Sequence, residues 1–120
     1  MLSRPEELRD RTKRFAMRIV RLFRSLPRTP DAQIMGKQLL RSGTSVAANY
    51  RAVCRARSKA EFIARVGVVV EEADESVFWL EMLTDNGIMK AVRVEPLLTE
   101  AKELTAIFTA SQETARRGRF

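Results

Sequence analysis

The sequence contains no histidine and only one cysteine, Cys54, in 120 residues. Without histidine the chain can form neither a Ser-His nor a Cys-His nucleophile pair, and it lacks the Glu-x-x-His motif of helical-bundle metal sites. A single cysteine cannot form a disulfide within the chain, which favours a reducing compartment. We therefore expect a cytoplasmic protein that is not an enzyme and that needs no metal or other cofactor.

Turn-forming residues and long apolar runs are also scarce. The chain has 5 Gly and 4 Pro, too few for an all-β fold with many turns. Its apolar runs reach only a few residues, and the charged N-terminal stretch has no apolar run of signal-peptide length. We expect neither a membrane span nor a signal peptide, and the length suits a single domain over residues 1–120.

Apolar residues recur at helical spacing in four segments of the chain. Each segment begins with a capping residue or a proline, namely Ser3, Thr29-Pro30, Ser58 with Glu61, and Pro96. The predicted helices cover residues 4–25, 30–56, 59–86 and 96–116. Because the connections between them are short, we predict an all-α fold, an antiparallel up-down four-helix bundle.

The third predicted helix has more apolar residues than one core face needs. Seven residues lie outside the stripe that repeats at helical spacing, namely Ala60, Ala64, Gly67, Val68, Phe78, Trp79 and Met82. The interface candidates among them are Val68, Phe78, Trp79 and Met82. One interpretation is a wide core stripe with Trp79 partly exposed. The other, which we favour, is a subunit interface, because adjacent exposed Phe and Trp side chains would be a liability in a monomer.

The stretch GTSVAANYRAVCRARS, residues 43–58, combines small residues, hydroxyl groups and arginines. It is not a phosphate-binding loop, because it has neither a G-x-x-x-x-G-K-[ST] nor a G-x-G-x-x-G motif and follows no predicted strand. We interpret it as continuous helix, with a lane of short polar side chains that forms a hydrogen-bonded seam beside the core. The polar lane comprises Gln38, Ser42, Ser45 and Asn49.

Charge is distributed unevenly along the chain, whose net charge is +7. Residues 1–30 carry nine Lys and Arg against three Asp and Glu, and residues 31–58 carry five against one. Residues 59–87 reverse the sign, with two against seven. We expect the acidic side chains of this third segment to pair with the basic first helix. They are Glu71, Glu72, Asp74 and Glu75.

Arginine outnumbers lysine on the polar faces of the first two predicted helices. A run of charges is often only a solvated helix face, and that interpretation stays open. Arginine, however, offers a planar fork that matches phosphate, so these residues are candidates for contacts with a nucleic-acid backbone. With Tyr50 as the one aromatic residue nearby, we expect binding that tolerates any sequence. The candidates are Arg11, Arg14, Arg18, Arg21, Arg28, Lys37, Arg41, Arg51 and Arg55.

Three motifs in the central part of the sequence resemble those of one known family. They are R-S-G-T-S-V-A-A-N-Y at residues 41–50, R-A-R-S-K-A-E-F-I at 55–63 and E-E-A-D-E-S-x-F-W-L-E at 71–81. Together they resemble the four-helix-bundle proteins encoded by intervening sequences inside bacterial 23S ribosomal RNA genes. The likeness is strong in the two central helices, whereas the outer two agree in length and pattern.

The resemblance implies a bundle that assembles into a homo-oligomeric ring, typically a pentamer, with no catalytic activity. It also implies kinship with the accessory variability protein of diversity-generating retroelements, a basic pentamer that binds nucleic acid and a reverse transcriptase. Family members often carry an acid where this chain has Ala52, so a role of that acid would be lost here. The family has no agreed active site, and none is transferred to this chain.

The residues and the resemblance together predict a non-enzymatic homo-oligomer that binds the backbone of RNA or DNA through its Arg-rich surface. The alternative is an interaction adaptor, in which the basic face docks an acidic protein partner or a reverse transcriptase. In neither case do we expect a membrane partner.

Overall fold

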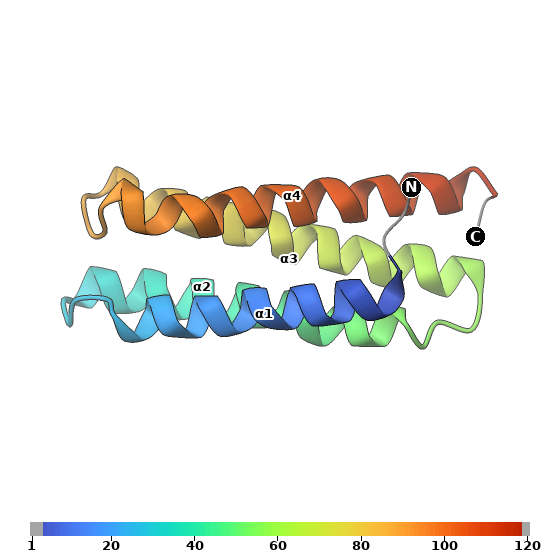
Figure 1. Cartoon of the computed structure of the whole chain (residues 1–120), viewed down its shortest axis with the longest axis horizontal. Coiled ribbons are helices and arrows are strands. Elements are labelled where there is room, and N and C mark those ends of the chain that lie inside the picture. The colour runs from blue at the N-terminus through green and yellow to red at the C-terminus, as the bar shows by residue number, and fades with distance from the viewer. Residues whose placement is uncertain (1–3, 119–120) are drawn as a thin grey trace.

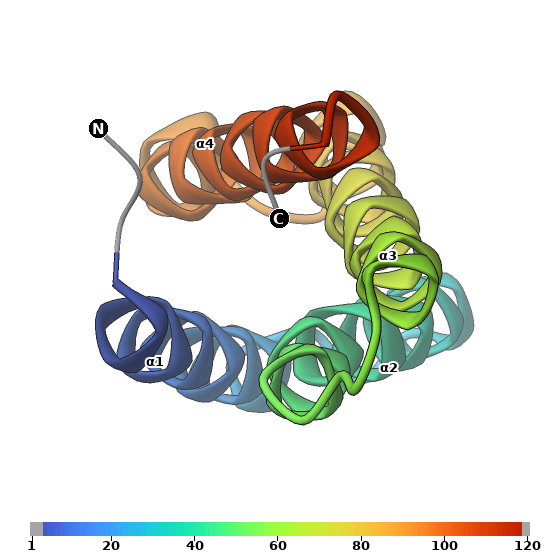
Figure 2. The same ribbon diagram turned by 90° about the vertical axis from the view of Figure 1, so that its right-hand side faces the viewer.

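Four antiparallel helices make up the protein in the computed structural model, which describes residues 4–118 (Figure 1). Helices adjacent in sequence are adjacent in space, and α1 and α4 pack less closely than the other neighbouring pairs (Figure 2). The predicted up-down bundle is therefore confirmed. Within the described residues, no helix is both long and apolar enough to cross a membrane. The helices are α1 (Pro5–Arg24), α2 (Pro30–Val53), α3 (Lys59–Asp85) and α4 (Ala91–Arg116).

The predicted helix starts are realised to different degrees. Ser58 caps α3 as expected, because its hydroxyl accepts a 3.0 Å hydrogen bond from the backbone N–H of Glu61. Thr29 precedes α2 and Pro30 occupies its first turn, yet the Thr29 side chain makes no capping hydrogen bond. Arg4 precedes α1, and Ser3 lies outside the described residues.

Two predicted helix boundaries were wrong. The fourth helix begins at Ala91 rather than at Pro96, which sits inside it. Pro96 is the sixth residue of α4, so it lacks the N–H that would bond to the carbonyl of Val92. The turn that precedes it brings the fully buried Val94 into the core. The second helix ends at Val53, not at residue 56, because the backbone N–H groups of Arg55 and Ala56 bond to carbonyls three residues back rather than four.

The hydrophobic core extends along the length of the bundle and uses the lanes that helical spacing predicts. Val46, Tyr50 and Val53 of α2 are buried, and the Tyr50 ring packs 5.1 Å from that of Phe108 in α4. Burying each such side chain stabilises the fold by roughly 1.5–3 kcal/mol relative to leaving it exposed. The core is thus the main source of stability, and the charged side chains are left for the surface.

Small residues let α2 approach its neighbours closely. Gly43 faces Ile19 of α1, and a Cβ at position 43 would lie only 2.8 Å from Ile19 Cγ1. On the other flank, Ser42 and Ser76 of α3 are both fully buried and their hydroxyl groups hydrogen-bond at 3.0 Å. These contacts set the spacing between α1, α2 and α3.

We predict that Gly43→Val lowers the free energy of unfolding by about 1–3 kcal/mol, because the new side chain overlaps Ile19 in a packed interface. Urea unfolding followed by circular dichroism measures the change. Ala48→Val is the matched control, since Ala48 is exposed on the same helix. Equal stability of the two variants would contradict the close approach of α1 and α2.

Candidate nucleic-acid interface

The α1–α4 seam is joined by one arginine that binds two carboxylates. Arg11 of α1 donates two hydrogen bonds to Glu100 of α4, at 2.8 and 2.7 Å, and a third to Glu103 at 2.7 Å. The Glu100 side chain is only 16% exposed. Hydrogen bonding from Arg11 holds the pKa of Glu100 below its ordinary value, although partial burial acts in the opposite direction.

A second arginine has the equivalent role between α2 and α3. Arg41 donates a 3.1 Å hydrogen bond to Glu72 and another to Glu75. The bond from Arg41 is the main reason that the pKa of Glu75 lies below its ordinary value. The acidic segment was expected to pair with the first helix, and this was wrong for these two residues. In the bundle α3 packs against α2 and α4, so Arg41 of α2 is the basic residue within reach.

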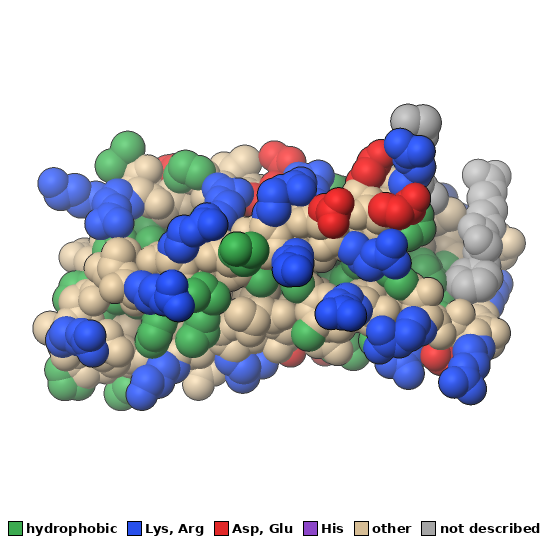
Figure 3. Space-filling model, turned by 60° about the horizontal axis from the view of Figure 1, so that its bottom comes forward, with side chains coloured by type: hydrophobic (Ala, Val, Ile, Leu, Met, Phe, Trp, Pro, Cys, Tyr) green, Lys and Arg blue, Asp and Glu red, His purple; other side chains and the backbone are tan. Residues whose placement is uncertain are grey.

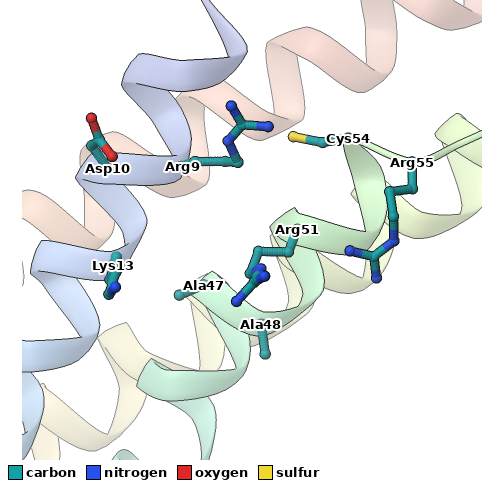
Figure 4. A pocket seen from close by; sticks show the side chains of 8 residues that line it. All are labelled: Arg9, Asp10, Lys13, Ala47, Ala48, Arg51, Cys54 and Arg55. Carbon is teal, nitrogen blue, oxygen red and sulfur yellow. The ribbon is translucent and has the colours of Figure 1, made fainter.

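A basic groove lies between α1 and the C-terminal part of α2 (Figure 4). Its volume is about 660 Å³. Cations stand on both walls, and Ala47 presents a low surface between them (Figure 4). Among the described residues, Asp10 is the one acidic member of the lining. The short Ala47 side chain on the floor leaves room for a ligand backbone to approach the helix. The cationic residues are Arg9 and Lys13 on one wall and Arg51 and Arg55 on the other.

The four cations of this groove differ from Arg11 and Arg41 in having no acidic partner. In the part of the chain that the structure describes, each is exposed and takes part in no ion pair. Their charges are close together and not neutralised, which favours an anionic ligand with several charges. Such a ligand would displace water and mobile counterions from the groove rather than break existing ion pairs.

The structure divides the nine predicted nucleic-acid residues into groups. Arg51 and Arg55 line the groove, whereas Arg11 and Arg41 are engaged in the inter-helix ion pairs. Four others, Arg14, Arg21, Arg28 and Lys37, are exposed outside the groove lining, and Arg18 is half-buried. Basic side chains spread along the α1–α2 face, where most of the visible acidic side chains lie in one area (Figure 3).

Sequence reasoning missed Arg9 and Lys13. They stand four residues apart on α1, and helical spacing alone would have placed them together. They lie on the flank of α1 that faces α2, whereas the predicted lane from Arg11 lies on the other flank, toward α4. Choosing between the flanks requires knowing which helix lies on each side.

An exposed apolar patch on α3 contains the four predicted interface residues. Phe78 is 49% exposed and Val68 40% exposed, while Trp79 and Met82 are half-buried. The rings of Phe78 and Trp79 meet edge to face at 4.8 Å, and the Trp79 indole donates a 3.1 Å hydrogen bond to Glu75. Contact with another subunit stays a prediction for this patch.

Only part of the polar lane of α2 forms the predicted hydrogen-bonded seam with a neighbouring helix. Ser42 bonds Ser76 across the helix interface, as expected, whereas Asn49 donates to the backbone carbonyl of Ser45 within its own helix at 2.9 Å. Cys54 is a free, half-buried thiol at the edge of the basic groove. Among residues 4–118, no three acidic or cysteine side chains come close enough together to hold a metal ion.

Fold and surface define the class, an antiparallel four-helix bundle with a basic groove between its first two helices. Residues 6–110 match the model of the 23S rRNA-intervening sequence protein family, and the chain belongs to this family. It is similar to a solved structure from Bacteroides thetaiotaomicron, a protein of unknown function from the S23 ribosomal protein family. The two are 32% identical over 92% of this chain and 98% of the other, with a TM-score of 0.84. Among curated proteins none matches the sequence.

We predict that Arg11→Ala lowers the free energy of unfolding by about 1–3 kcal/mol at neutral pH, because Glu100 loses its partner in a partly buried seam. The pKa of Glu100 is lowered by folding, so the stabilisation is present above its ordinary value of 4.5 and is lost as pH falls through the lower folded value. The difference from wild type should therefore shrink in acid. Urea unfolding at several pH values tests this.

The control for this variant is Arg14→Ala, which removes an exposed arginine of α1 that forms no ion pair in the described structure. It should change the free energy of unfolding little at any pH. A loss in Arg11→Ala that is no larger than in Arg14→Ala, or that does not depend on pH, would contradict the role of Arg11 in the seam.

Proposed function

We propose that this protein is a non-enzymatic, cytoplasmic module that binds the phosphate backbone of nucleic acid in the groove between α1 and α2. The observation that carries the proposal is the set of four unpaired cations on the two walls of one groove. The unpaired Cys54 supports a reducing compartment. Binding rather than catalysis is supported by the sequence, which has no histidine to act as a general base near neutral pH.

The chemistry of the groove favours contacts with phosphate over contacts with bases. Arg9, Arg51 and Arg55 offer guanidinium forks that bind phosphate oxygens in pairs. Among residues 4–118, no aromatic side chain lines the groove, so these residues offer bases no ring on which to stack. Affinity would come mainly from the release of counterions, and it would fall steeply with salt for any sequence.

RNA is the first nucleic acid to test. The family takes its description from an intervening sequence of 23S rRNA, and the similar solved structure is assigned to a ribosomal protein family. Those words describe the family and that protein. We propose RNA rather than DNA as the ligand of this chain on the basis of these two descriptions.

We also propose that a second copy of the chain covers the apolar patch on α3, within a homo-oligomer that is most simply a pentameric ring. The support is the exposure of Phe78 beside Trp79, together with the exposed Val68 three turns earlier on the same helix, a combination that favours burial in an interface. Assembly would repeat the basic groove around the particle. Several grooves on one particle would strengthen binding to a long polyanion.

The double variant Arg9→Gln/Arg51→Gln removes one cation from each wall of the groove. We expect it to weaken binding of a single-stranded RNA of about twelve nucleotides by about tenfold at moderate salt. The slope of the logarithm of affinity against the logarithm of salt should become shallower by about 1.5, because two phosphate contacts are lost. Fluorescence anisotropy at several salt concentrations measures both quantities, for two unrelated RNA sequences.

Lys59→Gln/Lys102→Gln is the matched control, because it removes the same charge from exposed positions outside the groove. It should change affinity and slope much less. Equal losses in both double variants would mean that net charge, not the groove, attracts RNA. Wild type that binds no RNA would reject the proposal and favour the alternative, an adaptor that docks an acidic protein.

For the apolar patch we predict that Phe78→Glu dissociates the assembly, since a charge would be buried without a partner. Light scattering with in-line size exclusion measures the mass. Val92→Glu on α4 is the control, because Val92 is 75% exposed and lies outside the patch. A Phe78→Glu variant that keeps the mass of a multimeric wild type would place the interface elsewhere, and a monomeric wild type would reject the oligomer.

A further inference from the structure

A second basic hollow lies at the other end of α1, between that helix and the start of α4. Three arginines from the two helices line it, Arg18 and Arg21 from α1 and Arg93 from α4. Its volume is about 310 Å³, at the lower end of the range for small-molecule sites. The C-terminal end of α1 and the N-terminal end of α4 lie at the same end of the bundle (Figure 1). The remaining lining residues are Leu22, Ser25, Pro96 and Leu97.

None of the three arginines has an acidic partner within the described residues 4–118. The carboxylate of Glu100 is close enough for the charge of Arg18 to help lower its pKa, after the larger effect of Arg11. Its two oxygens, however, are both bonded to Arg11. Three positive charges therefore share one hollow, whose lining contains no acidic residue in the described part of the chain.

The start of α4 adds further positive potential to this hollow. Arg93 is the third residue of α4, whose first turn contains no acidic side chain. Lys90, which precedes the helix, makes no capping hydrogen bond through its side chain. No acidic side chain in that turn therefore offsets the positive end of the helix dipole, which lies near Arg93. The exposed Pro96 supplies apolar surface for the body of a ligand, and the buried core residues Leu22 and Leu97 also line the hollow.

We propose that the hollow lined by Arg18, Arg21 and Arg93 binds a phosphate monoester. Three guanidinium groups and a helix N-terminus match a dianionic, three-oxygen terminal phosphate better than a phosphodiester, which carries one charge and two free oxygens. The volume accommodates the phosphate and the sugar attached to it. The monoester is either the 5′ end of a nucleic acid or a free nucleotide.

The site is separate from the α1–α2 groove, with which it shares no lining residue. The first source, a nucleic-acid end, rests on the proposed function, since it would add end recognition to backbone binding. The second source, a free phosphate compound, does not depend on that function. One experiment with two arms distinguishes the sources.

The first arm compares RNAs of one sequence and about twelve nucleotides, with either a 5′-phosphate or a 5′-hydroxyl group. Wild type should bind the 5′-phosphorylated RNA about tenfold more tightly. Arg93→Gln should reduce this ratio to about one while leaving the affinity for the 5′-hydroxyl RNA within about twofold. Lys102→Gln is the control, because it removes the same charge from α4 outside the hollow and should keep the ratio.

The second arm titrates wild type with inorganic phosphate, and with chloride at equal ionic strength, while the arginine Nε–H signals are followed by NMR. A saturable shift of Arg18, Arg21 and Arg93 with phosphate alone supports the site even if no RNA binds. Loss of the RNA end preference in Arg93→Gln without such a shift supports the site with nucleic-acid ends as the ligand. The proposal would be overturned if neither effect were seen. It would also be overturned if the RNA ratios of Arg93→Gln and Lys102→Gln were equal and phosphate caused no shift.

Discussion

Two arginines, Arg11 and Arg41, each bind a pair of carboxylates from a neighbouring helix, and the charge pattern of the surface depends on these contacts. They engage four of the acidic residues of α3 and α4 in the seams of the bundle. The basic residues on the α2-facing flank of α1 and at the end of α2 form no ion pair within the described residues. The cations of the groove, Arg9, Lys13, Arg51 and Arg55, are unpaired in the described structure. Four of the carboxylates of α3 and α4 are already bound to Arg11 and Arg41.

The same division separates stability from binding. The core and the two arginine seams hold the helices together, and both would tolerate changes on the outer α1–α2 face. Ala47 keeps the groove floor low, while Gly43 on the same helix allows α1 to approach closely enough to form its other wall. One short segment of α2 thus sets both the helix spacing and the shape of the candidate site.

Local physics made the helices and the core predictable from sequence, because apolar spacing and a side-chain cap such as Ser58 act within a few residues. The start of α4 was wrongly predicted at Pro96. The helix begins five residues earlier, at Ala91, because Val94 packs into the core, a contact that exists only in the folded bundle. For the candidate site, the sequence predicted the basic character of the surface but not which arginines are unpaired. Whether Arg11 is free or paired depends on Glu100, which is distant in sequence and adjacent only after folding. Arg9 was missed for the same reason.

The most direct test of this account follows the arginine Nε–H signals by NMR while a single-stranded RNA of about twelve nucleotides is added. The account predicts that the signals of Arg9, Arg51 and Arg55 shift, because these guanidinium groups are free to bind phosphate. The signals of Arg11 and Arg41 should stay in place, because their carboxylate partners hold them. Shifts of Arg11 and Arg41 without shifts in the groove would contradict the division between paired and unpaired arginines.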